Sequence, residues 1–363
     1  MKDILIICGG TGGHLSPGIA LAEELDIRGY SNLLCISHKT IDSAIIKKYN
    51  NLNFKSFYGI GSSRNLRGKF LFLHALFSSL PSILKVLIHH KPKVVFLFGG
   101  YLSVGFGLVS VLLGYNIVLH EANARVGKAV RLLQRFAKRV YLPEGVKICT
   151  IKGSKLRSMG YPLRKEMRLL DRKEARKQIG IDNNGLLLLV VGGSQGAEVL
   201  NKWVIDNYES LAEEGISIYC ISGLNNGLAS NDVLINSQGQ KVSIKMVPFS
   251  ENMAAVFSSG DLLISRAGGG TIAEIIKCKI PSILIPYPNS ADNHQLHNAK
   301  IHENLGAGIL IEQKNIDHLF DEVKALIHNE NLLKQIKINL ENLNKEDTAE
   351  LIVNDLESIV DLK

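Results

Sequence analysis

Two stretches of this chain follow the same plan, in which a short apolar strand runs into a glycine-rich turn and then into a helical pattern. The first reads LIICGGTGG over residues 5–13, and the second reads LLVVGGSQG over residues 188–196. A buried strand that turns directly into a helix is the opening unit of a doubly wound parallel sheet. Because this unit opens each half of a 363-residue chain, the sequence predicts two such α/β domains in tandem.

Short apolar runs alternate with helical patterns through both halves, which predicts parallel sheets covered by helices on both faces. The predicted strands are Ile4–Cys8, Leu33–Ser37, Val94–Phe98, Ile117–Leu119, Arg139–Leu142, Leu186–Val191, Ser217–Ile221, Ser243–Val247, Leu262–Ile264, Ser282–Ile285 and Gly308–Ile311. The predicted helices are Pro17–Arg28, Ile41–Tyr49, Phe70–Ile88, Val126–Ala137, Ala197–Glu213, Asn252–Ser258, Thr271–Lys277 and Asn293–Glu303. Glycine and proline interrupt a polar segment near residues 152–164, so we expect domains of 1–162 and 163–345, with a terminal helical segment at 346–363.

The charge of the chain is distributed unevenly. Residues 1–160 hold 22 Lys and Arg against 7 Asp and Glu, whereas residues 161–363 hold 20 against 27. A basic half predicts an anionic partner, either nucleic acid or a membrane surface, although the charge could simply aid solubility. The basic half lacks the interleaved aromatic residues of single-strand binding proteins, which argues against nucleic acid. Five scattered cysteines without metal-ligand spacing, and an N-terminus unlike a signal peptide, predict a cytosolic location.

Two apolar segments are candidates for spanning a membrane or binding to its surface. Residues 94–119 carry no charge over 26 positions, but glycines divide them, which favours a strand, a helix and a second strand over a membrane span. Phe70–Ile88 is interrupted by polar residues and flanked by basic ones, namely Arg64, Arg67, Lys69, Lys91 and Lys93. This pattern fits either a surface that rests on anionic lipid headgroups or a helix that covers the sheet.

The first glycine-rich turn, Gly9–His14, lets backbone N–H groups approach a phosphate or a sugar at the start of a helix. A nicotinamide-dinucleotide site is not favoured, because Leu15 stands in place of the third glycine and no carboxylate occupies Ser37–Lys39. His14 is a candidate general base, and it could equally cap the turn.

Three motifs in the second half suit a nucleotide and a sugar. Gly192–Ala197 repeats the first turn, and Ser265–Glu274 contains three glycines that enter a helix, a typical diphosphate cradle. Glu274 could accept hydrogen bonds from a ribose, or it could be a capping-box carboxylate. Asp292–Asn298 brings amide and carboxylate groups to the head of a helix, and its two histidines lack a third metal ligand. No Asp-x-Asp pair occurs, so helix N-termini and basic side chains must stabilise a departing diphosphate.

Together these motifs resemble those of the GT-B glycosyltransferases, and within them the family of peptidoglycan N-acetylglucosaminyltransferases. The matching signatures are GGTGGH at 9–14, GGYLS at 99–103, HEAN at 120–123, GYPLR at 160–164, GGSQGA at 192–197, AGGGTIAE at 267–274 and DNHQLHN at 292–298. The resemblance implies two Rossmann-like domains facing a cleft, with the C-terminal helix packing back on the first domain. It also implies inverting transfer of GlcNAc from UDP-GlcNAc to the MurNAc 4-hydroxyl of undecaprenyl-linked lipid I, which forms lipid II. Such an enzyme is peripheral on the cytoplasmic face of the inner membrane and needs no metal, cofactor or nucleic acid.

The resemblance also implies roles for individual residues. His14 is the general base, with Glu121 as a weaker alternative for the base or an orienting residue, and Tyr101 and Ser103 lie on the acceptor side. The residues implied to contact the donor are Thr11, Gly12 and Gly13 on the sugar and phosphate side, Asn123 and Gln295 at the GlcNAc, Arg164 and Ser194 at the diphosphate, Ser250 at the uracil, and Gly269, Gly270, Thr271, Ile272, Ala273 and Glu274 at the diphosphate and ribose.

Some positions depart from the family pattern, and other functions stay open. Ala122, Tyr161 and Gly105 replace a usual Gln, Asn and Pro, and Gly269-Gly270 replaces an Ala-Leu-like pair. The nearest alternative is another GT-B enzyme with a lipid acceptor such as diacylglycerol. A nucleotide-binding module without catalysis is the alternative from another class.

Overall fold

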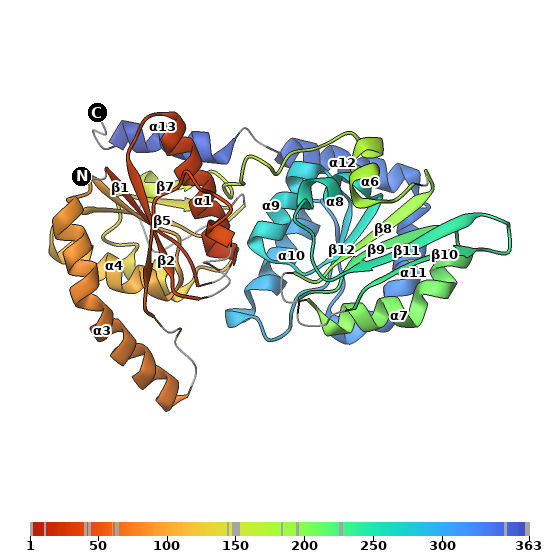
Figure 1. The fold of residues 1–363 in the computed structure, drawn as a ribbon, viewed down its shortest axis with the longest axis horizontal. Helices are drawn as coiled ribbons and strands as arrows, with labels where there is room; N and C mark the ends of the chain where they lie inside the picture. Colours follow the sequence, from red (N-terminus) through yellow and green to blue (C-terminus); the bar gives the residue numbers. More distant parts are fainter. Residues whose placement is uncertain are drawn as a thin grey trace. The chain divides into compact units, whose positions relative to one another are not determined.

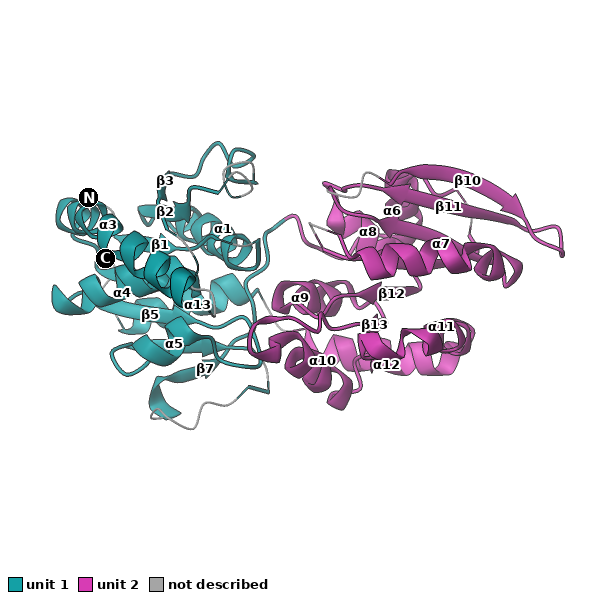
Figure 2. Ribbon diagram, turned by 90° about the horizontal axis from the view of Figure 1, so that it is seen from below, with its two compact units in different colours: residues 1–165, 346–363 teal, residues 166–345 magenta. Residues whose placement is uncertain are grey.

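The chain divides into two compact units, residues 1–165 with 346–363 and residues 166–345, each described here by itself (Figure 2). The structure is a computed structural model. It describes residues 3–10, 12–39, 42, 45–59, 61, 65–143, 145–146, 153–182, 184–193, 196–224, 228–344 and 347–359. The sequence placed the boundary after residue 162, three residues before the division seen here.

Unit 1, coloured red to yellow in Figure 1 with α13 in blue, is built on a seven-stranded parallel sheet. The order of its strands is β3-β2-β1-β4-β5-β6-β7. Its strands are β1 (Ile4–Ile7), β2 (Asn32–Ser37), β3 (Phe54–Phe57), β4 (Val94–Leu97), β5 (Asn116–His120), β6 (Arg139–Leu142) and β7 (Leu156–Ser158). Strand β1 pairs with β2 on one side and β4 on the other, and all three are buried along their whole length. The carboxyl ends of β1 and β4 therefore lie together at the middle of the sheet, where the first two glycine-rich signatures begin.

The helices of unit 1 are α1 (Gly12–Ile27), α3 (Leu66–His90), α4 (Gly100–Leu112), α5 (Lys128–Leu133) and α13 (Thr348–Ile359). The segment 94–119 forms β4, α4 and β5, as predicted. Helix α3 packs closely on α4 because Gly105 has no side chain; a Cβ there would lie 2.9 Å from Ile83 Cδ1. The predicted helix Ile41–Tyr49 includes positions outside the described residues.

The last described helix, α13, belongs to unit 1, as predicted. Its apolar residues Ile352, Val353 and Leu356 are buried in the core of this unit. Its Asp355 carboxylate accepts hydrogen bonds from Tyr141 Oη at 2.9 Å and Arg139 Nε at 3.0 Å. Apolar burial and ion pairing therefore both hold α13 against the N-terminal part of the chain.

Unit 2 repeats the architecture with a seven-stranded sheet in the order β10-β11-β9-β8-β12-β13-β14. Its strands are β8 (Leu186–Val191), β9 (Ile216–Ile221), β10 (Ser230–Ile235), β11 (Lys241–Val247), β12 (Leu262–Ser265), β13 (Ser282–Leu284) and β14 (Ile309–Leu310). Its helices are α6 (Arg172–Ile179), α7 (Glu198–Glu213), α8 (Met253–Ser259), α9 (Gly269–Cys278), α10 (His294–Asn304), α11 (Leu319–Ile327) and α12 (Glu330–Leu343). The predicted α/β class with two doubly wound sheets is confirmed. The edge strands β3, β7 and β10 were not predicted, and β10 runs antiparallel to β11.

A buried ion-pair cluster joins α6 to the sheet of unit 2. Asp261 Oδ2 accepts hydrogen bonds from Arg172 at 2.7 Å, from Arg176 at 3.0 Å and from the Leu187 N–H at 2.9 Å. Arg176 also donates from Nε to the Ser259 carbonyl oxygen at 3.0 Å and from Nη1 to the Gly185 carbonyl oxygen at 2.8 Å. Since Arg176 is only 3% exposed, this cluster neutralises a charge that would otherwise lie buried alone.

Candidate active site

The turn between β1 and α1 depends on glycine for two reasons. Gly9 and Gly10 have φ angles of 121° and 90°, where a side chain is strained. A Cβ at Gly10 would also lie 2.8 Å from Tyr101 Cε1, and one at Gly9 would lie 2.7 Å from the Ser37 nitrogen. The backbone of this turn therefore passes directly against Tyr101, one of the predicted acceptor-side residues.

Two side chains that were not predicted from the sequence hold this turn. Asp42 is buried, and its Oδ2 accepts hydrogen bonds from the Gly10 N–H at 2.6 Å and from the Ser37 hydroxyl. Lys39 Nζ donates to the Gly10 carbonyl oxygen at 2.7 Å. The carboxylate that seemed to be missing at the end of the second strand is thus present five residues later. It binds the glycine turn, and only its position in the fold reveals this.

His14 lies at the third position of α1, partly buried, with its imidazole over the start of α4. A Cβ at Gly99 would lie 3.6 Å from His14 Nε2, and one at Gly100 would lie 3.4 Å from Nδ1. Both glycines have positive φ angles, so the turn before α4 is shaped to admit this ring. Ser103 is fully buried and donates to the Gly99 carbonyl oxygen at 2.6 Å, which places it beneath the turn that receives His14.

The GYPLR signature supports the first turn of α1. Pro17 has no N–H for the Gly13 carbonyl oxygen four residues earlier, and the Tyr161 hydroxyl donates to that oxygen at 3.0 Å. His120 Nε2 donates to the neighbouring Gly160 carbonyl oxygen at 2.9 Å. Burial lowers the pKa of His120 to about 4, and a charge on His14 acts in the same direction. His120 is therefore buried and neutral, and it holds the Gly160 carbonyl oxygen. Tyr161, where the family usually has Asn, binds the Gly13 carbonyl oxygen in the first turn of α1.

Glu121 organises the loop after β5. Its Oε1 accepts hydrogen bonds from the backbone and side-chain nitrogens of Asn123 at 3.0 and 3.1 Å, and its Oε2 accepts one from Gly127 at 2.7 Å. Burial raises the pKa of Glu121, and these hydrogen bonds oppose that effect. Because both carboxylate oxygens are used within the loop, the geometry favours the orienting role over that of a base. Asn123 is the side chain that it orients.

In unit 2 the glycine cluster of residues 268–270 opens α9. Gly268 is the N-cap, and it has no side chain that could bind the N–H groups of Gly269, Gly270 and Thr271. Free N–H groups at a helix N-terminus form an anion-binding site. Glu274 is the sixth residue of α9, and the N-cap is a glycine, so the alternative of a capping box is wrong.

The other predicted site residues are spread over both units. Gly12 and Gly13 are the first two residues of α1, and Arg164 donates to the Tyr49 hydroxyl at 2.9 Å in unit 1. Ser250 follows β11, and Gln295 is the second residue of α10. Ile272 and Ala273 lie in α9. Thr11 and Ser194 lie outside the described residues.

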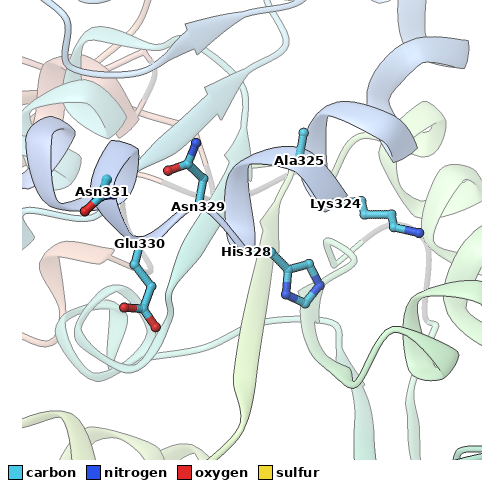
Figure 3. A pocket seen from close by; sticks show the side chains of 6 residues that line it. All are labelled: Lys324, Ala325, His328, Asn329, Glu330 and Asn331. Atoms are coloured by element: carbon cyan, nitrogen blue, oxygen red, sulfur yellow. The ribbon is translucent and has the colours of Figure 1, made fainter.

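A surface hollow of about 680 Å³ occurs at the junction of α11 and α12 (Figure 3). It is lined by Lys324, Ala325, His328, Asn329, Glu330 and Asn331. None of the site residues predicted from the sequence lines it. Within the ranges that the structure describes, no group of three or more His, Cys, Asp or Glu side chains is placed to hold a metal ion.

Because two histidines are buried, we expect the folded protein to lose stability at acidic pH. Burial lowers the pKa of both His120 and His302 from 6.5 to about 4. The folded chain therefore binds fewer protons than the unfolded chain between these values, so the free energy of unfolding falls as pH drops from about 6.5 to 4. We expect a loss of up to about 3 kcal/mol for each histidine. Urea titrations from pH 7.5 to 4.5 measure it, and His302→Gln should flatten the profile. The exposed His328→Gln should leave it unchanged, and an equal effect of the two variants would contradict the assignment.

Comparison with known proteins identifies the family. Residues 4–142 match the glycosyltransferase family 28 N-terminal domain, and residues 187–352 match the glycosyltransferase family 28 C-terminal domain. The chain belongs to glycosyltransferase family 28. The first match spans β1 to β6 of unit 1, and the second spans nearly all of unit 2 and the start of α13 in this family 28 enzyme.

Relatives of this family 28 enzyme match it along nearly its whole length. A protein of Opitutus terrae is 41% identical and covers 99% of this chain and 95% of its own. One of Prochlorococcus marinus is 33% identical, with coverages of 98% and 93%. Both are named UDP-N-acetylglucosamine–N-acetylmuramyl-(pentapeptide) pyrophosphoryl-undecaprenol N-acetylglucosamine transferase. The crystal structure of Acinetobacter baumannii MurG has the same fold, with a TM-score of 0.74, 23% identity and coverages of 99% and 100%. The predicted GT-B resemblance is confirmed.

Proposed function

We propose that this family 28 enzyme transfers GlcNAc from UDP-GlcNAc to the MurNAc 4-hydroxyl of lipid I, forming lipid II for peptidoglycan. The observation that carries the proposal is the 41% identity to a transferase of that name over 99% of the chain. The reaction makes it a hexosyltransferase. Its product feeds wall synthesis, on which cell shape and division depend.

The proposed reaction uses the glycine-rich turn at residues 9–14 and the glycine-rich start of α9. The acceptor oxygen attacks C1 of GlcNAc, the bond from C1 to the β-phosphate oxygen breaks, and the hydroxyl proton moves to His14. The position of His14 over the start of α4 supports this role, because a base must lie where the acceptor hydroxyl is held. The uncapped N-terminus of α9 supports diphosphate binding, since its N–H groups can stabilise the charge that develops on UDP. We propose that this electrostatic support replaces a divalent ion and that no cofactor is required.

A transfer assay tests the proposed function. Radiolabelled UDP-GlcNAc is incubated with a lipid I analogue or with diacylglycerol, and unlabelled UDP-glucose and UDP-galactose compete as donors. We expect label in the lipid I product only, with weak competition by either hexose donor. Transfer to diacylglycerol alone would support the nearest alternative, and donor binding without any transfer would support a module without catalysis.

Helix α3 supports peripheral attachment to the cytoplasmic face of an anionic membrane. Its apolar side chains Phe70, Leu73, Phe77, Leu84 and Ile88 are exposed and follow helical spacing along one stripe. The basic residues Arg67, Lys69, Lys85 and Lys91 accompany it on or next to the helix, and they are exposed too. Apolar insertion beside basic residues is the pattern of a helix that lies in the headgroup region. The N-terminal turns of α3 project beyond the rest of unit 1 (Figure 1).

Helix α3 is long and apolar enough to cross a membrane, with a mean hydropathy of 1.8 over its most apolar part. The packing of α3 argues against a membrane span. Ala75, Ser79, Ile83, Val86 and Leu87 are buried on the opposite side of the helix. A bilayer crossing would remove these residues from unit 1, whereas surface attachment uses only the exposed stripe.

Removing two aromatic side chains from the stripe should weaken membrane binding. Phe70 and Phe77 are 69% and 66% exposed, so Phe70→Ser with Phe77→Ser should leave the fold intact. We expect vesicle binding to fall about tenfold to a hundredfold, because two apolar groups no longer insert. Co-sedimentation with phosphatidylglycerol-containing liposomes measures it. The matched control is Val233→Ser with Ile235→Ser on β10, where Ile235 is 68% exposed. Equal losses in both variants, or no binding by the unaltered protein at any salt concentration, would contradict the proposal.

A further inference from the structure

The loop between β13 and α10 has an unusual backbone. Asp292 and Asn293, the last residues before α10, have φ angles of 51° and 55°. Two successive residues other than glycine in the left-handed region are costly, so the surrounding structure must hold them. Within this loop the Ser290 N–H donates to the Tyr287 carbonyl oxygen at 3.1 Å, and the Asn293 N–H donates to the Ser290 carbonyl oxygen at 3.0 Å. The conformation of the loop therefore depends on the placement of Tyr287.

Arg266 holds the segment just before Tyr287. It follows β12, and its Nη1 donates to the carbonyl oxygens of Ile285 at 3.0 Å and Pro286 at 3.4 Å. Its guanidinium carbon lies 5.5 Å from the centre of the Tyr287 ring. A planar guanidinium can bind carbonyl oxygens in its plane and contact an aromatic ring with its face, which a lysine ammonium cannot do. Arg266 is not among the site residues predicted from the sequence.

The Tyr287 peptide in turn orients Gln295. The Tyr287 N–H donates to Gln295 Oε1 at 2.8 Å. An N–H needs an acceptor, so this bond fixes which end of the amide faces Tyr287. Gln295 Nε2 then faces away with its two N–H donors. The Ser290 hydroxyl, which accepts from the Gln295 backbone N–H at 3.4 Å, holds the same residue at its backbone.

We propose that Arg266 is a positioning residue, which holds the Tyr287 peptide so that Gln295 offers its amide N–H donors to hydroxyl oxygens of the donor sugar. This inference rests on the proposed function, because it assumes that the donor sugar lies at Gln295. Toward the sugar Gln295 would act only as a hydrogen-bond donor, because its amide oxygen accepts from the Tyr287 N–H. A competing assignment is direct contact between Arg266 and the diphosphate, and the two assignments differ in how UDP itself should bind.

Calorimetric titration of UDP and of UDP-GlcNAc separates them. We expect Arg266→Met to weaken UDP-GlcNAc binding about fivefold to tenfold, the effect of one neutral hydrogen bond, and to change UDP binding less than about twofold. Arg266→Lys should behave like Arg266→Met, since it keeps the charge and loses the planar fork. Gln295→Glu should reproduce the loss for UDP-GlcNAc, because its oxygen still accepts from Tyr287 while the N–H donors are gone. Lys300→Met on the exposed face of α10 is the matched control and should bind both ligands normally.

A double-mutant cycle shows whether Arg266 acts through Gln295. In a Gln295→Ala background, Arg266→Met should weaken UDP-GlcNAc binding by less than about twofold further. Full additivity of the two losses would overturn the proposal, and so would an equal loss of UDP affinity or recovery with Arg266→Lys. A thermal melt of each variant detects unfolding. Tyr287→Ala keeps the backbone N–H that binds Gln295, so it should lose less affinity for UDP-GlcNAc than Arg266→Met. If the unaltered protein binds UDP but shows no added affinity for any UDP-sugar, the proposed function fails first.

Discussion

Replacing His14 by alanine should lower the turnover of the transfer reaction about a hundredfold to ten thousandfold, the usual contribution of general base catalysis. The affinity for UDP-GlcNAc should stay nearly unchanged. We expect this because the proposed role of His14 is to accept the proton of the acceptor hydroxyl, and its imidazole lies over Gly99 and Gly100 at the start of α4. The uncapped helix N-terminus proposed for the diphosphate lies in unit 2. Initial rates with saturating lipid I analogue give the turnover, and calorimetric titration gives the donor affinity.

A matched control is available on another surface. His328 is exposed and lines the hollow at the junction of α11 and α12, so His328→Ala should keep full activity. A variant His14→Ala that cannot bind UDP-GlcNAc would reassign His14 to substrate binding. Normal turnover would remove it from the chemistry, and Glu121 would then be the remaining base among the predicted residues.

The largest expected loss of stability comes from Asp261→Ala, which should lower the free energy of unfolding by about 3–5 kcal/mol. The alanine leaves Arg176, which is almost completely buried, without its carboxylate, and the Leu187 N–H loses its acceptor as well. Part of the cost comes from the uncompensated charge, so Asp261→Ala with Arg176→Met should be more stable than Asp261→Ala alone. Urea denaturation followed by circular dichroism measures both variants.

The exposed pair Lys202 and Asp206 provides the comparison. It has a similar separation, 2.8 Å, but its side chains are 74% and 50% exposed. Asp206→Ala should therefore change stability by less than about 1 kcal/mol, as expected for solvated ion pairs. Similar losses for Asp206→Ala and Asp261→Ala would show that burial does not determine the effect.

The fold was predictable where burial leaves a continuous apolar run. Strands β1, β4 and β8 are of this kind, and each was found close to its observed bounds. Strand β3 was missed because three of its four residues are exposed and its sequence, FKSF, is half polar. Strand β10 was missed for a related reason: as an edge strand it keeps polar residues, and it exposes Val233 and Ile235 to solvent. An edge strand is stabilised by pairing with a single neighbouring strand, and the sequence of the strand itself does not indicate that pairing.

The candidate site was predictable where backbone geometry dictates the residue type. Glycines that follow β1, β4 and β12 are required by positive φ angles or by open helix N-termini. Such positions form glycine-rich motifs that can be recognised in the sequence. Asp42 and Arg266 were not found, because each acts on a turn that is distant in sequence; Arg266 lies within the glycine-rich motif 265–274, but its contact with residues 285 and 286 is visible only in the fold. Tyr161 looked like a departure from the family pattern until its hydroxyl was seen to serve the carbonyl oxygen that Pro17 leaves open.

The return of α13 to unit 1 has a consequence for synthesis on the ribosome. Unit 2, residues 166–345, emerges as one continuous stretch and can fold before translation reaches α13. Synthesis of unit 1 begins first. Its core nevertheless stays incomplete until Ile352, Val353 and Leu356 have left the exit tunnel, because these residues fill part of it. The half of the molecule that is made first is therefore the half that is finished last, and during that interval its unfilled apolar surface is available to chaperones.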